Sequence, residues 1–383
     1  MEIVTIISLV LVLAATFYLV IHTGLIIGLK RCKQTKITLH PFVSVIVAAR
    51  NEERTIGQVL DCLLKQTYAH YEIIIINDRS TDNMAAIIAD FQKKNPAIKR
   101  IDIFTVPSDM PAKKNALRSG IETSKGEILC FTDADCFPPP TWLAELVQQF
   151  EPKVGMVAGY SPYTIPSDKT ITSRILKKMF FKFIAYEEFR AAIWSSGAIG
   201  WNLGWLCTGR NLAYRRKVYN EAGGFEKIKH SVSGDDDLFL QLVRKQTDWE
   251  IRYIKTRESF VPTVSPADFR SFVEQRKRHF SASKVFTFPM MLFFFFYHFA
   301  NLLLFFSPFL FLFHLLSIQL VIVSIGTKLF SDAVLVLSSA RTFDGNAYRY
   351  SFIIMEVIYV FYNSLIGPLG IFKKFKWKQS ITA

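Results

Sequence analysis

The sequence predicts an α/β domain with a mostly parallel sheet, combined with α-helical segments that cross a membrane. Between residues 41 and 284, short continuous apolar runs alternate with helical patterns, as in a parallel sheet covered on both faces. Residues 1–30 and 285–372 instead carry long apolar runs. Half of the 383 residues are hydrophobic and only 20% are charged, which excludes a disordered chain and is unusual for a soluble enzyme.

The N-terminal segment has the length and the flanking charges of a membrane anchor. Residues 3–29 contain no Asp, Glu, Lys or Arg, and a basic cluster follows at residues 30–33. About 20 apolar residues suffice to cross a bilayer. A cleaved signal peptide is the alternative, but it has a basic start and a shorter apolar core. We therefore expect residues 1–30 to be a transmembrane helix, with the basic cluster in the cytosol.

The first half of the expected cytosolic domain, residues 41–284, alternates strand and helix in order. Strands are expected at residues 42–49, 72–76, 101–106 and 127–132. Helices are expected at residues 55–66, 82–94 and 113–123, and after the prolines 138–140 as far as residue 150. Because ligands of such sheets bind beyond the carboxyl ends of the strands, the polar residues at those ends are the candidate site.

Several polar side chains follow these strands directly. They are Arg50, Asn51, Glu52 and Glu53 after the first strand, Asn77 and Asp78 after the second, Lys113 at the helix after the third, and Asp133 and Asp135 after the fourth. Two carboxylates two residues apart can hold one Mg²⁺ or Mn²⁺, with diphosphate oxygens completing the coordination; a solvated turn is the alternative. No G-x-G-x-x-G follows the first strand, which argues against a dinucleotide-binding domain.

Three further segments are candidates for catalysis and acceptor binding. Residues 235–237 are consecutive Asp residues before an apolar helix; their repulsion predicts a raised pKa for at least one, which suits a general base, although acids are also favoured at any helix N-terminus. The segment C-T-G-R-N at residues 207–211 could line an acceptor pocket. The segment Q-R-K-R-H at residues 275–279 is by itself typical of a basic interfacial helix.

The C-terminal third carries further apolar runs. Residues 285–306 and 308–326 predict a helical hairpin that turns near Ser307 and Pro308, and residues 351–372 form another run. Residues 332–340 are too short to span alone. The basic tail at 373–383 is expected in the cytosol, so either one segment is re-entrant or interfacial, or residues 329–340 join a span.

Taken in order, these segments resemble membrane-bound glycosyltransferase family 2, in the group of ceramide glucosyltransferases, N-acetylglucosaminyltransferases and polysaccharide synthases. The resemblance rests on PFVSVIVAARNEE, IIINDRSTDN, AKKNALRSGIE, ILCFTDADC, CTGRNLAY, GDDDL and QRKRH, which stand in the family's order. It implies the GT-A fold, a nucleotide-diphosphate sugar (expected to be a UDP-sugar) as donor, a Mg or Mn divalent cation, and inversion at the anomeric carbon.

The resemblance also assigns roles to individual residues. The donor-binding residues are Ala49, Asn51, Glu52, Asp78, Lys113 and Asp133. The metal ligands are Asp135 and Asp133, and the catalytic pair is Asp236 with Asp235. The acceptor-binding residues are Thr208, Gly209, Asn211, Gln275, Arg278 and His279. Three positions depart from the family pattern: Ala112 replaces a Gly, Asp235 replaces a Glu, and His279 replaces a Trp that stacks on the acceptor. Lys177, Lys178 and Lys182 stand among Ile and Phe, so residues 165–189 are expected to form an amphipathic helix on the membrane, as members of the family often have there.

We therefore expect a multi-pass glycosyltransferase of the inner cell membrane, with a cytosolic catalytic domain and a lipid or lipid-linked glycan as acceptor. A processive polysaccharide synthase and a non-catalytic nucleotide-sugar-binding protein are the alternatives. Transfer of one or a few sugars is favoured, because the apolar runs offer few polar residues to line a channel beyond His298, Asn301, His314 and Glu356. The formal net charge of +14 lies mainly in interfacial stretches and the tail, so membrane lipids explain it better than a nucleic acid.

Overall fold

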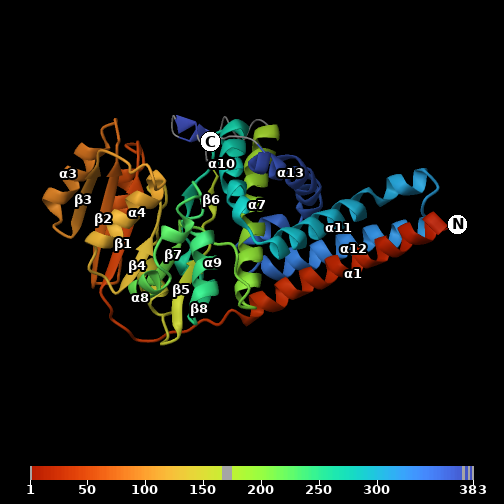
Figure 1. Cartoon of the computed structure of the whole chain (residues 1–383), viewed down its shortest axis with the longest axis horizontal. Coiled ribbons are helices and arrows are strands. Elements are labelled where there is room, and N and C mark those ends of the chain that lie inside the picture. Colours follow the sequence, from red (N-terminus) through yellow and green to blue (C-terminus); the bar gives the residue numbers. More distant parts are fainter. Residues whose placement is uncertain (1, 166–174, 373–375, 378–379, 382–383) are drawn as a thin grey trace. The chain divides into compact units, whose positions relative to one another are not determined.

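The computed structural model describes residues 2–165, 175–372, 376–377 and 380–381. The chain divides into two compact units (Figure 1). The α/β unit comprises Leu29–Ser265, and the apolar unit comprises Met1–Gly28 with Pro266–Ala383.

The α/β unit is built on a seven-stranded sheet of order β3-β2-β1-β4-β7-β5-β8 (Figure 1). Its strands are β1 Val43–Ala49, β2 Tyr71–Asp78, β3 Ile98–Ile103, β4 Ile128–Phe131, β5 Val154–Gly159, β7 Leu212–Arg215 and β8 Glu250–Ile254. Strand β7 is antiparallel to β4 and β5, and the other neighbouring pairs are parallel. The predicted mostly parallel α/β sheet is therefore confirmed. A separate parallel pair is formed by β6 Tyr163–Thr164 and β9 Thr263–Val264.

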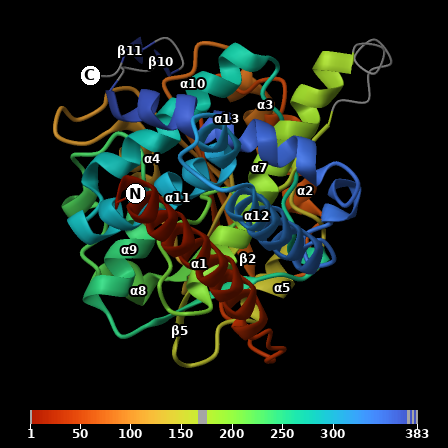
Figure 2. The same ribbon diagram turned by 90° about the vertical axis from the view of Figure 1, so that its right-hand side faces the viewer.

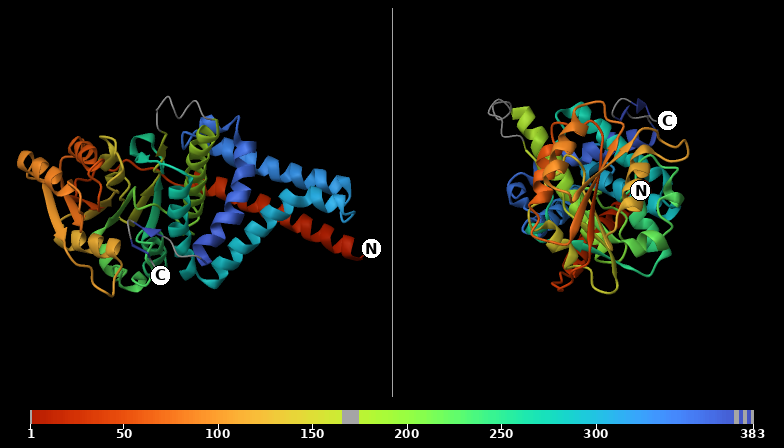
Figure 3. Two further views of the ribbon diagram at one scale, coloured as in Figure 1. Left: turned by 90° about the horizontal axis from the view of Figure 1, so that it is seen from above. Right: turned by 90° about the vertical axis from the view of Figure 1, so that its left-hand side faces the viewer.

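Helices cover both faces of this sheet (Figure 3). The helices of the unit are α2 Ile56–Leu64, α3 Met84–Lys94, α4 Ala112–Thr123, α5 Trp142–Val147, α7 Ile175–Ile199, α8 Arg216–Glu221 and α9 Asp237–Gln246. On one face, buried side chains of α2, α3 and α5 pack with those of β1 and β2. On the other, α4 approaches so closely that a Cβ on Gly120 would lie 2.7 Å from Ile76 and 2.8 Å from Ile46. This close packing holds the first turn of α4, with Lys113, at the carboxyl edge of the sheet.

Two elements of the α/β unit differ from the sequence prediction. Strand β3 covers Ile98–Ile103 and not 101–106, because its register with β2 pairs Ile98 with Ile73. Helix α7 continues to Ile199, and its side chains are buried almost throughout from Phe181 onward, so an amphipathic surface helix ending at residue 189 is wrong. Only its first turns, with Lys177 and Lys178, are exposed, and residues 166–174 of that prediction lie outside the described residues.

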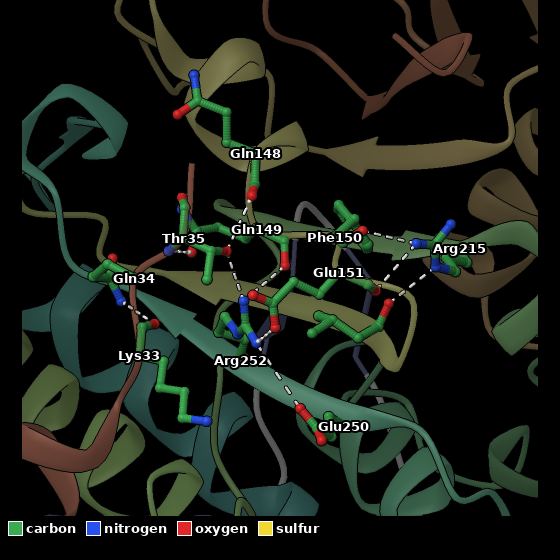
Figure 4. A network of polar contacts seen from close by, with 11 residues as sticks. Lys33, Gln34, Thr35, Gln148, Gln149, Phe150, Glu151, Arg215, Glu250 and Arg252 are labelled. Atoms are coloured by element: carbon green, nitrogen blue, oxygen red, sulfur yellow. Dashed lines mark hydrogen bonds and ion pairs between the residues drawn. The ribbon is translucent and has the colours of Figure 1, made fainter. Parts of the chain in front are cut away.

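A polar network fastens the segment after α1 to the amino edge of the sheet (Figure 4). Arg252 of β8 donates to Thr35 Oγ1 at 2.8 Å and to the Gln149 carbonyl at 3.1 Å, and it pairs with Glu151 at 2.8 Å. The Gln149 side chain bonds the Thr35 backbone in both directions, at 3.2 and 3.0 Å. Because Glu151 precedes β5, this network lies at the end of the sheet opposite the polar loops predicted to form the site.

Among the described residues, three helices are long and apolar enough to cross a membrane: α1 Glu2–Arg31, α11 Phe288–Leu312 and α12 Ile318–Ser339. Apart from the last residues of α1, these helices belong to the apolar unit. Helix α13 Phe352–Phe372 includes a shorter apolar stretch, and α10 Phe269–Ser281 packs against it through Phe272 and Tyr362, whose ring centroids are 5.7 Å apart (Figure 2). Residues 269–281 thus group with the apolar helices and not with the sheet.

The predicted hairpin turn at Ser307 and Pro308 is wrong, since α11 continues through both residues and the chain turns after Leu312. Proline lacks the N–H that would bond the Leu304 carbonyl, and the Ser307 hydroxyl donates to that carbonyl at 2.9 Å. The replacement hydrogen bond allows the helix to continue. Helix α12 includes residues 332–339 of the short apolar run at 332–340. This run therefore extends a longer apolar helix, which was one of the two alternatives that the sequence allowed.

A buried polar cluster lies among α1, α11 and α12, which run side by side in Figure 1. Its members are Tyr18, His22, Tyr297, Lys328, Ser331 and Asp332. Lys328 pairs with Asp332 at 2.8 Å, and Tyr18 donates to the same carboxylate at 2.7 Å. His22 lies 2.9 Å from the Tyr297 hydroxyl. Charged side chains within membrane-spanning helices are tolerated when they are paired in this way. Lys328 and Asp332 thus add to the polar residues that the sequence indicated for these helices.

Candidate active site

The loops after β1 and β2 are tied to each other by side chains from the predicted donor site. Asn51 adopts a positive φ of 53°, its N–H donates to Ser80 Oγ at 3.0 Å, and its Oδ1 accepts from the Thr81 N–H at 2.8 Å. The neighbouring Glu53 N–H donates to Asp82 at 2.9 Å. These bonds hold the loop that carries Asn51 and Glu52 beside the end of β2.

Asp78 ends β2 and is buried. Arg79 donates to both of its carboxylate oxygens, at 2.8 and 3.1 Å, and this hydrogen-bonded pairing raises the pKa of Arg79. Ala49 ends β1, adjacent to β2, and is also buried. The two hydrogen bonds from Arg79 therefore fix the orientation of the Asp78 carboxylate at the end of β2.

Lys113 joins two of the predicted acids. Its ammonium lies 3.2 Å from Asp133 and 3.1 Å from Asp235. A small pocket surrounds the three side chains; it is lined by Lys113, Leu117, Phe131, Thr132, Asp133, Gly209, Leu212, Tyr214, Phe225 and Asp235. Residues from α4, the β4 loop and the segment before α9 thus meet at one place, as the topology of a parallel sheet predicts.

Asp133 and Asp135 fit a divalent-cation site. Burial raises the pKa of Asp135 to about 6, and the nearby charges of Asp133 and Glu52 add to the shift. A divalent cation relieves this kind of crowding among carboxylates. Within the described part of the chain, no group of three or more His, Cys, Asp or Glu side chains is arranged to hold a metal. If a cation binds here, Asp133 and Asp135 would be its two ligands from this motif, and substrate oxygens would have to supply others.

The Asp236 carboxylate is fixed by two backbone amides. It accepts from the Gly209 N–H and from the Asp237 N–H, both at 2.8 Å, and it caps α9. Burial raises the pKa of Asp236, but a hydrogen bond from the Asp237 side chain, the charge of Lys113 and the two amides outweigh it and leave the pKa below its ordinary range. Burial and the Asp236 charge raise the pKa of Asp237 well above its ordinary value. The two shifts run in opposite directions, so Asp236 is the more acidic member of the pair.

The acceptor residues predicted from C-T-G-R-N do not all reach the site. Gly209 lines the pocket and Thr208 is half-buried beside it. Asn211 is fully buried: it accepts from Trp142 Nε1 at 2.9 Å and donates to the carbonyls of Tyr160 and Ser259 at 2.8 and 2.9 Å. All of these partners are core groups, so Asn211 stabilises the fold and its assignment to acceptor binding is wrong.

Gln275, Arg278 and His279 lie on α10, in the apolar unit. Asp268 caps this helix by accepting from the Ser271 N–H at 2.8 Å, and Lys277 pairs with Glu274 at 2.6 Å. A role of Gln275, Arg278 and His279 in binding an acceptor stays a prediction from the resemblance.

Lys114 is a further residue beside the site, outside the sets assigned from the motifs. Its side chain is fully buried, and its ammonium donates to the carbonyls of Ser231 and Ser233, the latter at 2.7 Å. Burial lowers the pKa of Lys114, while the charges of Asp235 and Asp236 oppose the shift. It secures the segment before Asp235. The signal was present, since position 114 shares a helix face with buried Leu117 and Ile121.

The sheet topology, with acidic residues at its carboxyl edge, is that of the GT-A fold. Residues 44–222 match the family model "Glycosyl transferase family 2", in agreement with the resemblance predicted from the motifs. A mannosyltransferase of Pyrobaculum calidifontis, solved with GDP-Man and Mn²⁺, shares the fold, with a TM-score of 0.53 and 18% identity over 94% of this chain and 99% of its own.

Two curated relatives carry more specific names. The beta-monoglucosyldiacylglycerol synthase of Nostoc sp. is 27% identical over 261 residues, which are 67% of this chain and 53% of the relative. The poly-beta-1,6-N-acetyl-D-glucosamine synthase of Staphylococcus epidermidis is 37% identical over 119 residues, which are 30% of this chain and 28% of the relative. The matched segments thus span about half of the first relative and less of the second.

Proposed function

We propose that this protein is a membrane-bound, divalent-cation-dependent, inverting glycosyltransferase that moves a sugar from a nucleotide-diphosphate sugar to a lipid or lipid-linked acceptor. One observation carries the proposal: Lys113 lies within 3.2 Å of both Asp133 and Asp235, and its charge also acts on the adjacent Asp236. This reaction needs three groups at one site: a positive charge and a carboxylate near the donor, and a second carboxylate that acts as base on the acceptor.

The proposed mechanism assigns each side chain a separate task. The loop with Asn51 and Glu52, together with Asp78, binds the nucleotide. Asp133 and Asp135 would hold the divalent cation, which would supply positive charge toward the leaving diphosphate. Lys113 adds a second positive charge on the same side.

Asp236 acts as the general base on the acceptor hydroxyl. Its low pKa keeps the carboxylate unprotonated at neutral pH, and the two amides from Gly209 and Asp237 keep it oriented. A carboxylate of low basicity can still accept the proton, because the hydroxyl becomes acidic as its oxygen bonds to the anomeric carbon. The attack from the face opposite the leaving group inverts the configuration.

Two observations support an acceptor in the membrane. In the part of the chain that the structure describes, three helices are long and apolar enough to cross a bilayer, and the relative from Nostoc is named for the synthesis of a glucosylated diacylglycerol. The basic cluster after α1 supports a cytosolic catalytic domain at the inner membrane. The relative from Staphylococcus keeps a processive polysaccharide synthase as the second candidate. Among the described residues, the charged pair Lys328 and Asp332 is satisfied within its own cluster, which favours a packed bundle over a channel.

The test uses the purified full-length chain with Mn²⁺, a panel of UDP- and GDP-sugars, and an extract of native membrane lipids. We expect one donor to release its nucleoside diphosphate and to yield a lipid-extractable product carrying one or a few sugars. A long, water-soluble polysaccharide made by the purified chain alone would establish the second candidate. Donor binding without hydrolysis or transfer to any lipid would refute catalysis altogether.

A further inference from the structure

A buried ion pair joins helix α7 to the C-T-G-R-N segment. Arg210 donates to Glu188 Oε1 at 2.6 Å, and both side chains are less than a tenth exposed. The same guanidinium donates to Thr208 Oγ1 at 3.0 Å and lies over the Tyr163 ring, 5.2 Å from its centroid. The polar contacts come from different N–H groups of one planar guanidinium, which fixes its orientation.

The Gly209 amide, which donates to Asp236, belongs to a short segment that the ion pair and the core hold on either side. Gly209, whose N–H bonds Asp236, is flanked on one side by Thr208 and on the other by Arg210. Arg210 binds Thr208 through its side chain, and the next residue, Asn211, is anchored in the core. Contacts thus run from Glu188 through Arg210 to Thr208, the residue that precedes the Gly209 N–H. The charge of Arg210 also acts on Asp135.

We propose that Arg210, held by Glu188, is a positioning residue of the transfer reaction that fixes the Gly209 amide and hence the Asp236 carboxylate. The inference rests on the proposed function, because it concerns the base of that reaction. Buried ion pairs add little net stability compared with apolar residues of the same size, so stability alone gives little reason for a charged pair at this place. A general base must be held within a fraction of an ångström of its proton, and small displacements reduce the rate about 100-fold.

The chain supplies a matched control. Arg252 is also buried and pairs with Glu151 at 2.8 Å, but this pair lies at the amino edge of the sheet (Figure 4). Arg252→Lys and Glu151→Gln therefore repeat the chemistry of Arg210→Lys and Glu188→Gln away from the site. Glu188→Gln keeps an oxygen that can accept from Arg210 and removes only the charge, so it tests the inference even if Arg210→Lys fails to fold.

The experiment measures kcat, the KM for the donor and the melting temperature of the full-length chain for the four variants. We expect Arg210→Lys to lower kcat by about 10- to 100-fold and Glu188→Gln by about 3- to 10-fold, with the donor KM changed less than about threefold. The variants at Arg252 and Glu151 should melt at lower temperature but keep kcat within about twofold of the wild type.

Two results would overturn the inference while the proposed function stands: a wild-type kcat in both site variants, or an equal loss of kcat in the control variants. A wild-type chain that transfers no sugar to any acceptor would instead refute the proposed function itself, and the positioning role with it.

Discussion

Replacing Asn211 with Ala tests whether this residue holds the core together or binds an acceptor. The change removes the acceptor of Trp142 Nε1 and the donor to the Ser259 carbonyl, both buried. The Tyr160 carbonyl also loses a bond but keeps the one from the Val261 N–H at 3.2 Å. Two buried polar groups are left unsatisfied at about 1–3 kcal/mol each, so we expect a loss of about 2–6 kcal/mol.

A loss of that size is large against the stability of an ordinary domain, and it should lower the melting temperature by about 5–20 °C. Intrinsic-fluorescence melting of the full-length chain in detergent measures the shift. Asn220→Ala is the control, because it removes the same side chain from an exposed position on α8 and should change stability by no more than about 0.5 kcal/mol. Unchanged melting of Asn211→Ala, together with a raised KM for the acceptor, would show that the core assignment is mistaken.

Three further predictions concern single charges. Asp135→Ala should abolish Mn²⁺-dependent turnover and weaken donor binding, since it removes one of two carboxylates from the proposed cation site; turnover with the wild-type Mn²⁺ dependence would contradict that assignment. Asp236→Asn should lower kcat by about 10²- to 10⁴-fold with the donor Kd nearly unchanged, and a near-normal kcat would place the base on a neighbouring Asp. Asp332→Asn should lower the thermal stability of the solubilised chain, because it removes the carboxylate that pairs with Lys328. The double variant Lys328→Met with Asp332→Leu should restore the melting temperature. Equal melting of the single and double variants would argue against the pairing.

Much of the site was predictable because a parallel sheet places the carboxyl ends of its strands at one edge. Residues that follow β1, β2 and β4 had to come together there, whatever the details of packing. The motifs therefore indicated Asn51, Asp78 and Asp133 before any coordinates, and helical periodicity placed Lys113 at the same edge. The apolar runs likewise revealed the long helices, because their length and composition alone meet the requirement of a bilayer.

The tertiary structure decided which polar residues face the site and which support it. Arg210 and Asn211 are neighbours in one motif, yet one pairs with Glu188 of α7 and the other with Trp142 and two core carbonyls. Their partners lie 22 and 69 positions away, and no local pattern in the sequence encodes such contacts. Pro308 would end the helix if the Leu304 carbonyl were left without a hydrogen bond. The Ser307 hydroxyl supplies that bond, and its position depends on side-chain geometry that the sequence does not show. Local periodicity therefore determined the elements and their edges, and long-range pairing of buried polar groups determined their roles.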